Sequence, residues 1–400
     1  MTQDFFAGNR HSLFVPADDG LYVVTAYTQT QRGNDAAFAF EQEANFWYLT
    51  GINFPDWWVI ITRSKSWLVA PDVDHVHQVF DGSLSSGAAR QISGVDEVIS
   101  YKDGIKVLRD LSKKYSSVGT IGPDPYKKHY DFALNPAQAA LQRRLGRMFT
   151  EVSDCRQQLS KLRAIKQPQE IAAMRAAIKL TNDTFRTVQA KLASLQFEYE
   201  VEAEFTYAFR KAGAAGHAYD PIVASGHHAC TLHYNANDSQ LHPNSLLLLD
   251  IGARVDGYAA DITRTYAIGT PTKRQRAVHA AVQSAQQRII ALLKPGFGLK
   301  EYSEQVDNIM KSALVSLGLM KDIDDARSYR LYFPHAVSHG LGIDVHDSLG
   351  RPDTLLPGMV MTVEPGIYIP EEGIGVRIED DILITPDGHE NLSDDLSTDL

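Results

Sequence analysis

Asp250 and Asp261 are two carboxylates whose spacing could bring them to one ion. They flank an Asp256-Gly257 dipeptide between two apolar runs, and this dipeptide is a strong signal for a two-residue hairpin turn. That turn would place Asp261 opposite Gly252, so the two carboxylates would be diagonal neighbours on one face, about 7–8 Å apart at the backbone. Alternatively, Asp250 caps a strand and Asp261 lies at the surface. Against this, Asp250 follows four leucines, where an unpaired carboxylate is costly to bury.

A second predicted hairpin spans residues 358–385 and carries Glu364 and Glu379. With Pro370–Gly373 as its loop, the two glutamates would face each other directly, with Cβ atoms about 4.5–5.5 Å apart. Like charges in that position destabilise a sheet unless a cation lies between them. The register depends on the assumed loop, and a shift by one residue would turn one glutamate toward solvent.

Four histidines are the other candidates for chemistry. His335, His339 and His346 lie close together among glycines, and His233 stands in TLHYN. A single histidine is more often structural, and for His233 alone that alternative stays open. Imidazole is nevertheless a common metal ligand and the proton carrier that works near neutral pH. We therefore treat all four as candidate site residues.

Two aspartates, two glutamates and a histidine make a donor set of oxygen and nitrogen atoms. Such a set suits a pair of hard or borderline divalent cations, such as Mn²⁺, Zn²⁺ or Co²⁺. A thiolate cluster is excluded because the chain has only two cysteines. The sequence also lacks the phosphate-binding loop of nucleotide-binding proteins and the G-x-S-x-G turn of serine hydrolases.

The composition limits the partners and the compartment. The 400 residues include 39 basic and 49 acidic side chains, for a net charge of −10. This acidic balance argues against a nucleic-acid binder and against binding to an anionic membrane. Two cysteines in a chain of this length indicate free thiols in a reducing compartment. With no signal peptide and no apolar run approaching about 20 residues, we expect a soluble, cytoplasmic protein.

The elements that must position these residues fall into two predicted domains, 1–160 and 161–400, because the composition shifts near 155–168. The first is predicted to be α/β, with strands at 22–28, 57–62, 67–71 and 117–122 and a helix at 105–115. The second is predicted to be α+β, with helices at 169–194, 197–213, 272–293 and 299–318 between β-rich stretches at 222–268 and 331–387. The acidic ending NLSDDLSTDL is compatible with a solvated tail.

Several motifs resemble one known family, in its order and spacing. They are DIGARVDGYAADITRTY, SHGLGIDVHD, TVEPGIY, GVRIEDD and LRAIKQPQEI. These segments resemble the pita-bread metallopeptidases, in the proline-directed branch that holds prolidase (Xaa-Pro dipeptidase) and aminopeptidase P. The resemblance spans nearly the whole chain. It implies a C-terminal pita-bread catalytic domain behind a smaller α/β N-terminal domain.

The resemblance also implies a role for each candidate residue. Asp250 would bind one metal ion, Asp261 and Glu379 would bridge two, and His339 and Glu364 would complete the second site. The catalytic residues would be His233, His335, His346 and Glu364, the last as the proton carrier. The cofactor would be two divalent ions, with Mn²⁺ favoured over Zn²⁺ or Co²⁺.

The implied activity is hydrolysis of Xaa-Pro bonds in small proline-containing peptides. We favour an Xaa-Pro dipeptidase, because Arg351 or Arg377 could bind the C-terminal carboxylate of a dipeptide through bidentate hydrogen bonds. For Arg351 a surface salt bridge is the alternative. Aminopeptidase P, which acts on longer peptides, is the alternative activity, and a non-enzymatic peptide-binding protein on the same fold is a remote one. A homodimer with its contact in the N-terminal domain is expected from the family.

Overall fold

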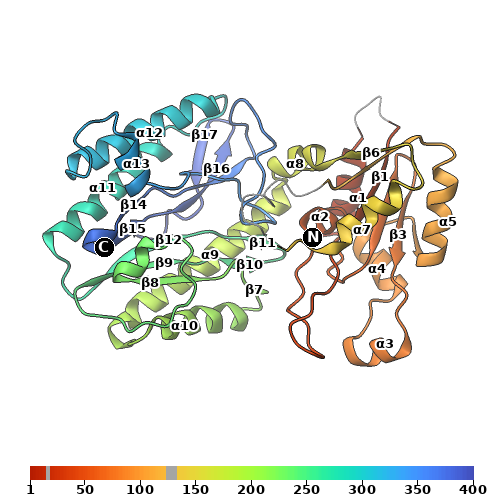
Figure 1. Ribbon diagram of the computed structural model, residues 1–400, viewed down its shortest axis with the longest axis horizontal. Helices are drawn as coiled ribbons and strands as arrows, with labels where there is room; N and C mark the ends of the chain where they lie inside the picture. Colours follow the sequence, from red (N-terminus) through yellow and green to blue (C-terminus); the bar gives the residue numbers. More distant parts are fainter. Residues whose placement is uncertain (15–18, 123–132) are drawn as a thin grey trace. The chain divides into compact units, whose positions relative to one another are not determined.

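The protein is described here from a computed structural model that covers residues 1–14, 19–122 and 133–400. Its contacts divide the chain into two compact units, Met1–Leu162 and Arg163–Leu400 (Figure 1). Among the described residues, no helix combines the length and the apolar character that a membrane span requires.

The first unit is built on a six-stranded mixed sheet in the order β4-β3-β2-β1-β5-β6. The central strands β1, β2 and β3 are antiparallel, and β4, β5 and β6 each join parallel to a neighbour. The strands are β1 (Leu21–Thr25), β2 (Trp58–Thr62), β3 (Ser66–Ala70), β4 (Glu97–Ser100), β5 (Ser117–Thr120) and β6 (Glu151–Asp154). The predicted α/β character of this unit is confirmed.

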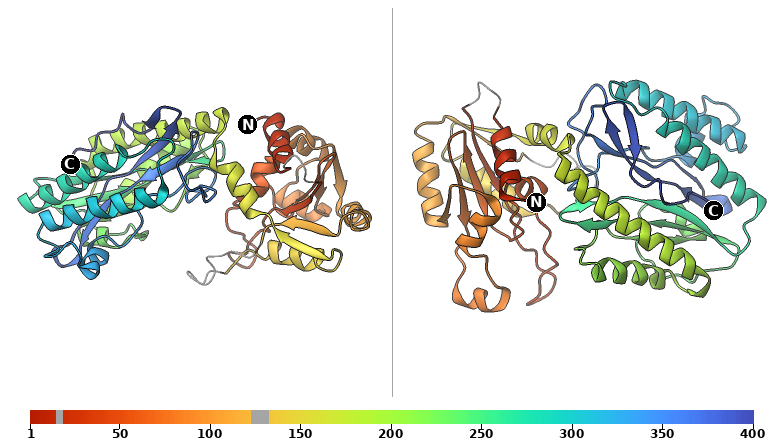
Figure 2. Two further views of the ribbon diagram at one scale, coloured as in Figure 1. Left: turned by 90° about the horizontal axis from the view of Figure 1, so that it is seen from above. Right: turned by 180° about the vertical axis from the view of Figure 1, so that it is seen from behind.

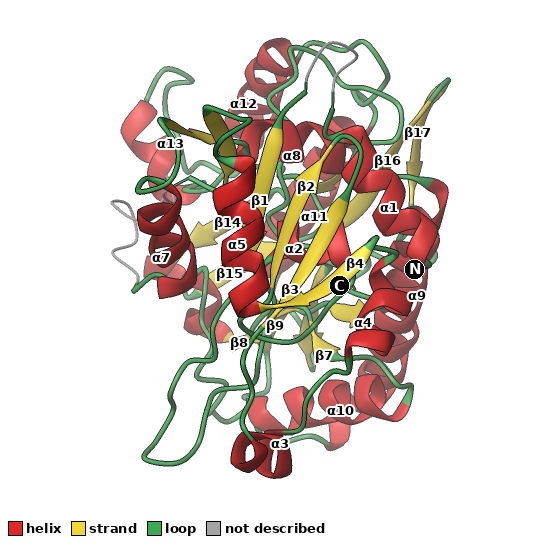
Figure 3. Ribbon diagram, turned by 90° about the vertical axis from the view of Figure 1, so that its right-hand side faces the viewer, coloured by secondary structure: helices red, strands yellow, loops and turns green. Residues whose placement is uncertain are grey.

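Helices cover this sheet on both faces. The helices of the unit are α1 (Gln3–Ser12), α2 (Ala44–Thr50), α3 (His75–Asp81), α4 (Ser86–Ser93), α5 (Tyr101–Leu111), α7 (Pro136–Leu145) and α8 (Arg156–Ala164), which runs across the division. Helix α3 has no buried residue and does not cover the sheet. Figure 3 shows α5 and α7 beside this sheet, and their leucines pack with Val23, Ile60 and Val69 in one core. Helix α5 begins four residues before its predicted start, because the Ser100 hydroxyl accepts the Asp103 N–H and caps it there.

The second unit consists of small sheets and long helices, as predicted. The helices are α9 (Pro168–Lys191), α10 (Glu198–Lys211), α11 (Lys273–Ile290), α12 (Leu299–Ser316) and α13 (Ala326–Tyr332), with short 3₁₀ segments η1 (Leu192–Ser194), η2 (Gly226–Cys230) and η3 (Pro370–Glu372). The strands are β7 (Gly216–His217), β8 (Ile222–Ser225), β9 (Ser245–Asp250), β10 (Ala253–Val255), β11 (Tyr258–Ala259), β12 (Thr263–Ile268), β13 (Val360–Val363), β14 (Gly366–Ile369), β15 (Ile374–Arg377), β16 (Asp380–Thr385) and β17 (Gly388–Asn391).

Two helix pairs cover these strands and enclose separate cores. Helices α9 and α10 pack on β8, β9, β10 and β12, through residues such as Phe185, Phe205 and Leu249. Helices α11 and α12 pack on β13 to β16, through residues such as Val282, Met310 and Val376 (Figure 2). The polar side chains described below come from these strands and from the segments that join them.

The first predicted hairpin has the predicted register. Asp256 and Gly257 have φ angles of 49° and 85°, as a type I′ turn requires. Val255 pairs with Tyr258, and the same register continues to Asp250, which pairs with Thr263. Asp250, at the end of β9, and Asp261, just before β12, are therefore diagonal neighbours.

The second hairpin also keeps its predicted register, but its ladder is divided between two sheets. Gly366 pairs with Arg377 on one side, and Val363 pairs with Asp380 on the other. Glu364 and Glu379 lie at the division, where their N–H groups donate instead to the carbonyls of Val337 and Thr263, at 2.9 and 3.0 Å. The two glutamates thus stand where three segments of the chain meet.

Candidate metal centre

The structure brings Asp261, His339 and Glu379 together. Each of the three offers one ligand atom, and these atoms lie within 4.8 Å of one another. Glu364 joins the group, because its Oε1 is 3.3 Å from Nε2 of His339, which is also 3.4 Å from Oδ2 of Asp261. Both predicted hairpins and the histidine-rich segment therefore supply side chains to one place.

The ring of His339 is oriented as a metal ligand needs to be. Its Nδ1 lies 3.0 Å from the carbonyl oxygen of Gly340, which can only accept, so Nδ1 carries the proton. This leaves Nε2 facing the carboxylates of Asp261 and Glu364. Burial alone would lower the pKa of His339, but the hydrogen bond from its ring to Asp261 and the negative charges of Glu364 and Asp261 raise it to about 9. A backbone carbonyl that fixes the ring in this way is typical of histidine ligands.

The buried carboxylates lack enough positive charge around them. Burial, together with repulsion from the neighbouring carboxylates, raises the pKa of Asp261 and of Glu379. Burial likewise raises the pKa of Glu364 to about 7, although the charge of His339 opposes the shift. Carboxylates gathered at this depth repel one another unless cations lie among them. The oxygen and imidazole donors match hard or borderline divalent ions, so the residues present fit a metal centre.

Two protein donors hold the carboxylate of Asp250. The Tyr219 hydroxyl donates to its Oδ1 and the Arg377 guanidinium to its Oδ2, both at 2.6 Å. Its charge nevertheless contributes to the raised pKa of Asp261 and Glu379, so Asp250 lies beside them. To bind a metal ion as predicted, Asp250 would have to lose one of these hydrogen bonds, or share its carboxylate between the metal ion and the two donors.

His335 is linked to Arg377 through Tyr368. Its Nδ1 donates to the Ala336 carbonyl at 2.7 Å, and burial, with the charge of Arg377, lowers the pKa of this histidine to about 4. The neutral ring therefore accepts the Tyr368 hydroxyl proton at Nε2, at 2.8 Å, while Arg377 donates to the Tyr368 oxygen. This connection holds His335 as a neutral ring next to Glu364, 3.7 Å away.

The other two histidines lie beside the centre. The ring of His346 is 4.1 Å from that of His339, and burial, with the charges of His339 and His233, lowers the pKa of His346 to about 4. His233 is exposed, and its charge acts on both His335 and His346. All four predicted histidines therefore surround one site.

The two predicted substrate-binding arginines differ sharply. Arg377 is buried, and its three nitrogens donate to Thr263, Tyr368 and Asp250. Arg351 is exposed, has φ of 55°, and makes no ion pair or hydrogen bond within the described part of the chain. Arg377 therefore orders the site itself, and substrate binding by either residue stays a prediction.

Three side chains of the site were missed by sequence reasoning. Thr263 donates a hydrogen bond to Glu379 at 2.6 Å. The Tyr219 hydroxyl donates to Asp250, and the Tyr368 hydroxyl donates to His335. Thr263 could have been found, because it is two residues from Asp261 and so shares its strand face. Tyr219 gives no comparable signal, since it lies 31 residues from the carboxylate that it binds.

Comparison with known proteins agrees with this geometry. Residues 172–386 match the model of metallopeptidase family M24, and residues 6–119 match the aminopeptidase P N-terminal domain. The chain belongs to metallopeptidase family M24. It is therefore an enzyme, a metallopeptidase of the proline-specific pita-bread family, and it depends on divalent metal ions.

Members of M24 resemble this chain over nearly its full length. It is 33% identical to the Xaa-Pro aminopeptidase of Escherichia coli K12 over 93% of this chain and 90% of that one. It is 33% identical to human Xaa-Pro aminopeptidase 3 over 94% of this chain and 78% of that one. A solved structure of E. coli aminopeptidase P superposes with a TM-score of 0.87 at 31% identity, covering 100% of this chain and 96% of the other. The two-domain fold is thus the one found in aminopeptidase P.

Proposed function

We propose that the protein is an Xaa-Pro aminopeptidase, which removes the N-terminal residue from peptides whose second residue is proline. The observation that carries this proposal is the match, across both units, to proteins named Xaa-Pro aminopeptidase. The comparisons thus favour our alternative activity over the dipeptidase that we favoured from the sequence.

The residues of the centre suit this hydrolysis. Two bound divalent ions would polarise the scissile carbonyl and lower the pKa of water. Glu364 lies beside His339 and His335, where its carboxylate would take a proton from the attacking water and pass it to the leaving proline nitrogen. His346 would donate a hydrogen bond to the oxyanion, and His233, on the exposed side, would orient the peptide. Proline lacks the N–H through which other proteases hold a strand-like substrate, so a dedicated site is needed.

The arginines also support an aminopeptidase. A dipeptidase has to pair the carboxylate of Xaa-Pro with a fixed cation. Arg377 already donates to three neighbours, and Arg351 is exposed and unanchored. A longer peptide places no carboxylate on its proline residue, so it does not need either group.

The test compares two substrates with the same first residue, Xaa-Pro and Xaa-Pro-Xaa, using the full-length protein with added Mn²⁺. We expect kcat/KM at least about tenfold higher for the tripeptide. The dipeptide places a carboxylate on its proline, and a carboxylate without a cationic partner weakens binding by about that factor. The Arg351→Ala variant serves as the matched control and should leave this ratio unchanged. Turnover of the dipeptide alone, or its loss in Arg351→Ala, would restore the dipeptidase interpretation.

Manganese is our proposal for the native metal. Carboxylate-rich sites with one imidazole accept Mn²⁺, and Zn²⁺ or Co²⁺ would also fit the donors. The test is elemental analysis of protein purified without added metal, followed by reactivation of metal-free protein with each ion. Zinc at two ions per chain, with activity restored by zinc alone, would contradict the proposal.

Two further proposals concern assembly and compartment. A homodimer is supported by α3, where Val76, Val79 and Phe80 expose 60–82% of their surface, because such apolar side chains are usually covered by a partner. Sedimentation velocity should give about twice the chain mass, and Phe80→Asp should shift it toward the monomer.

The two free cysteines support a reducing, cytoplasmic location, which cell fractionation would test.

A further inference from the structure

The acidic C-terminal segment Asn391–Ser397, here called the C-terminal strap, is not a solvated tail. Ser393 is fully buried and Leu396 is 3% exposed within the core under α9 and α10. Asp395 accepts hydrogen bonds from Asn182 and Arg186. The segment that the sequence suggested to be solvated is therefore anchored along its length.

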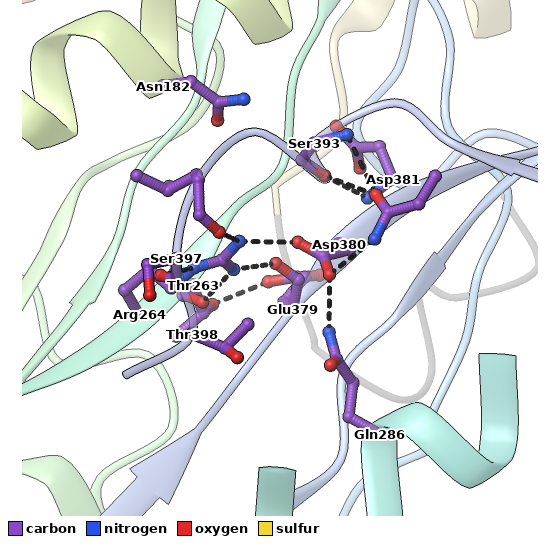
Figure 4. Close-up of polar contacts among 12 residues, drawn as sticks. Asn182, Thr263, Arg264, Gln286, Glu379, Asp380, Asp381, Ser393, Ser397 and Thr398 are labelled. Carbon is purple, nitrogen blue, oxygen red and sulfur yellow. Dashed lines mark hydrogen bonds and ion pairs between the residues drawn. The ribbon is translucent and has the colours of Figure 1, made fainter. Parts of the chain in front are cut away.

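Arg264 joins this strap to a predicted bridging ligand. It is 1% exposed, lies on β12, and its guanidinium points between the strap and Glu379 (Figure 4). It donates to five oxygens within 3.0 Å, which are the carbonyls of Thr263, Glu379, Leu396 and Ser397 and the carboxylate of Asp380. The Arg264 guanidinium thus connects the backbone at Glu379 to the backbone of the strap.

The strap reaches Asp261 by a second route. The hydroxyl of Ser393 accepts the N–H of Asp381 at 3.0 Å, and Oδ2 of Asp381 accepts the N–H of Asp261 at 3.1 Å. Asp380, which lies between Glu379 and Asp381, is fixed in turn. Its carboxylate accepts hydrogen bonds from Gln286 and Asn391, at 2.7 and 2.9 Å. Both predicted bridging residues, Asp261 and Glu379, are therefore connected to the strap through hydrogen bonds of Asp381 and Arg264.

We propose that Arg264 and the C-terminal strap are positioning elements of the metal centre, which hold in place the backbone of Asp261 and Glu379, two residues that would bind the ions. The proposal concerns metal binding and does not depend on which peptide is cleaved. A guanidinium can serve five acceptors in one plane, whereas an ammonium group has three donors on a flexible stem. Groups that orient metal ligands typically change metal affinity 10–100-fold when they are altered.

The experiment measures Co²⁺ binding to metal-free, full-length protein by visible absorption, so its readouts are an affinity and a spectrum. Arg264→Lys retains the charge but loses most of the five contacts. A chain ending at Asp394 removes the strap carbonyls that Arg264 binds. Each change should weaken Co²⁺ affinity 10–100-fold and alter the absorption band of the bound ion.

Matched controls separate positioning from general stability. A chain ending at Thr398 retains both strap carbonyls, and Arg175→Ala removes an exposed ion pair with Glu390 that touches no ligand. Both should change Co²⁺ affinity less than about twofold. Ser393→Ala, a small change in a buried site, should weaken it several-fold and decides the question if Arg264→Lys fails to fold.

Combining Arg264→Lys with the chain ending at Asp394 tests whether the strap acts through Arg264. Because both changes break the same connection, the double variant should bind Co²⁺ no more than about twofold more weakly than the worse single one. Fully multiplicative losses would overturn the connection. A folded Arg264→Lys or Ser393→Ala protein with a lower unfolding temperature but unchanged affinity and spectrum would overturn the proposal.

Discussion

Asp250 and Glu364 lie on different hairpins, and the protein holds them to different degrees. The Asp250 carboxylate receives hydrogen bonds from Tyr219 and Arg377, both at 2.6 Å. The Glu364 carboxylate receives a donor from Thr362 at 3.3 Å and otherwise faces histidine rings at 3.3 and 3.7 Å. The Asp250 carboxylate is therefore fixed by protein donors, whereas the Glu364 carboxylate is free to exchange a proton.

The largest expected effect is on the Glu364 side. Glu364→Gln keeps the volume but removes the group that accepts a proton, so kcat should fall about 10²–10⁴-fold. Steady-state kinetics on an Xaa-Pro-Xaa peptide with saturating Mn²⁺ would measure the loss. Glu372→Gln, which alters a partly exposed ion pair with Arg274, is the control and should retain nearly full activity. If Glu364→Gln retained more than a tenth of the activity, its proton-carrying role would be wrong.

The next effect concerns the fixed side. Arg377→Lys keeps a positive charge but cannot donate to Thr263, Tyr368 and Asp250 together. Metal affinity should fall about 10–100-fold, as measured by calorimetric titration of Mn²⁺ into metal-free protein. Arg276→Lys, on helix α11, provides the matched exchange at a distance. An unchanged affinity would show that Asp250 does not depend on Arg377.

Much of this site was predictable because hairpins obey short-range rules. The Asp256-Gly257 turn and the period-two alternation of strands placed Asp250 and Asp261 correctly, and the Pro370–Gly373 loop did the same for Glu364 and Glu379. The four long helices of the second unit were also predicted within a few residues, since long amphipathic patterns are the clearest signal. The short helix α13 (Ala326–Tyr332) was not predicted. In the first unit, short helices such as α2 have too few turns to show a period.

The contacts that hold the ligands were not predictable in the same way. Arg264 binds the Glu379 carbonyl across 115 residues of chain, and no local pattern marks it as different from a surface arginine on an amphipathic strand. Arg377 was assigned to substrate because its type suits a carboxylate, and only the folded packing shows that Asp250 is its partner. The residue types suggested the chemistry, whereas long-range packing decided which group served which partner.

A smaller effect should separate the two donors on Asp250. Tyr219→Phe removes one hydrogen bond and leaves Arg377 in place, so metal affinity should fall about 3–10-fold, as expected for a single bond. The same Mn²⁺ titration measures it. Tyr207→Phe, at an exposed tyrosine on α10, is the control. A loss as large as that of Arg377→Lys would mean that the hydroxyl, rather than the guanidinium, is the main support.

The smallest expected effect is on the stability of metal-free protein between pH 7 and 9. In this range the folded protein binds more protons than the unfolded chain, because the pKa of Glu364 is raised to about 7 and that of His339 to about 9. The free energy of unfolding therefore falls as the pH rises. Below this range His279, His335 and His346, each with a pKa lowered to about 4, act with the opposite sign.

Calorimetry of metal-free protein should show this as a fall in Tm of a few degrees from pH 7 to 9, at about 2–4 °C for each kcal/mol. Saturating Mn²⁺ should reverse the trend, because ligands must lose their protons to bind metal, so the stabilisation by metal grows with pH. His339→Gln cannot titrate and should flatten the metal-free slope. A metal-free Tm that rises over this range would mean that the carboxylates are already charged, and that Glu364 is held as firmly as Asp250.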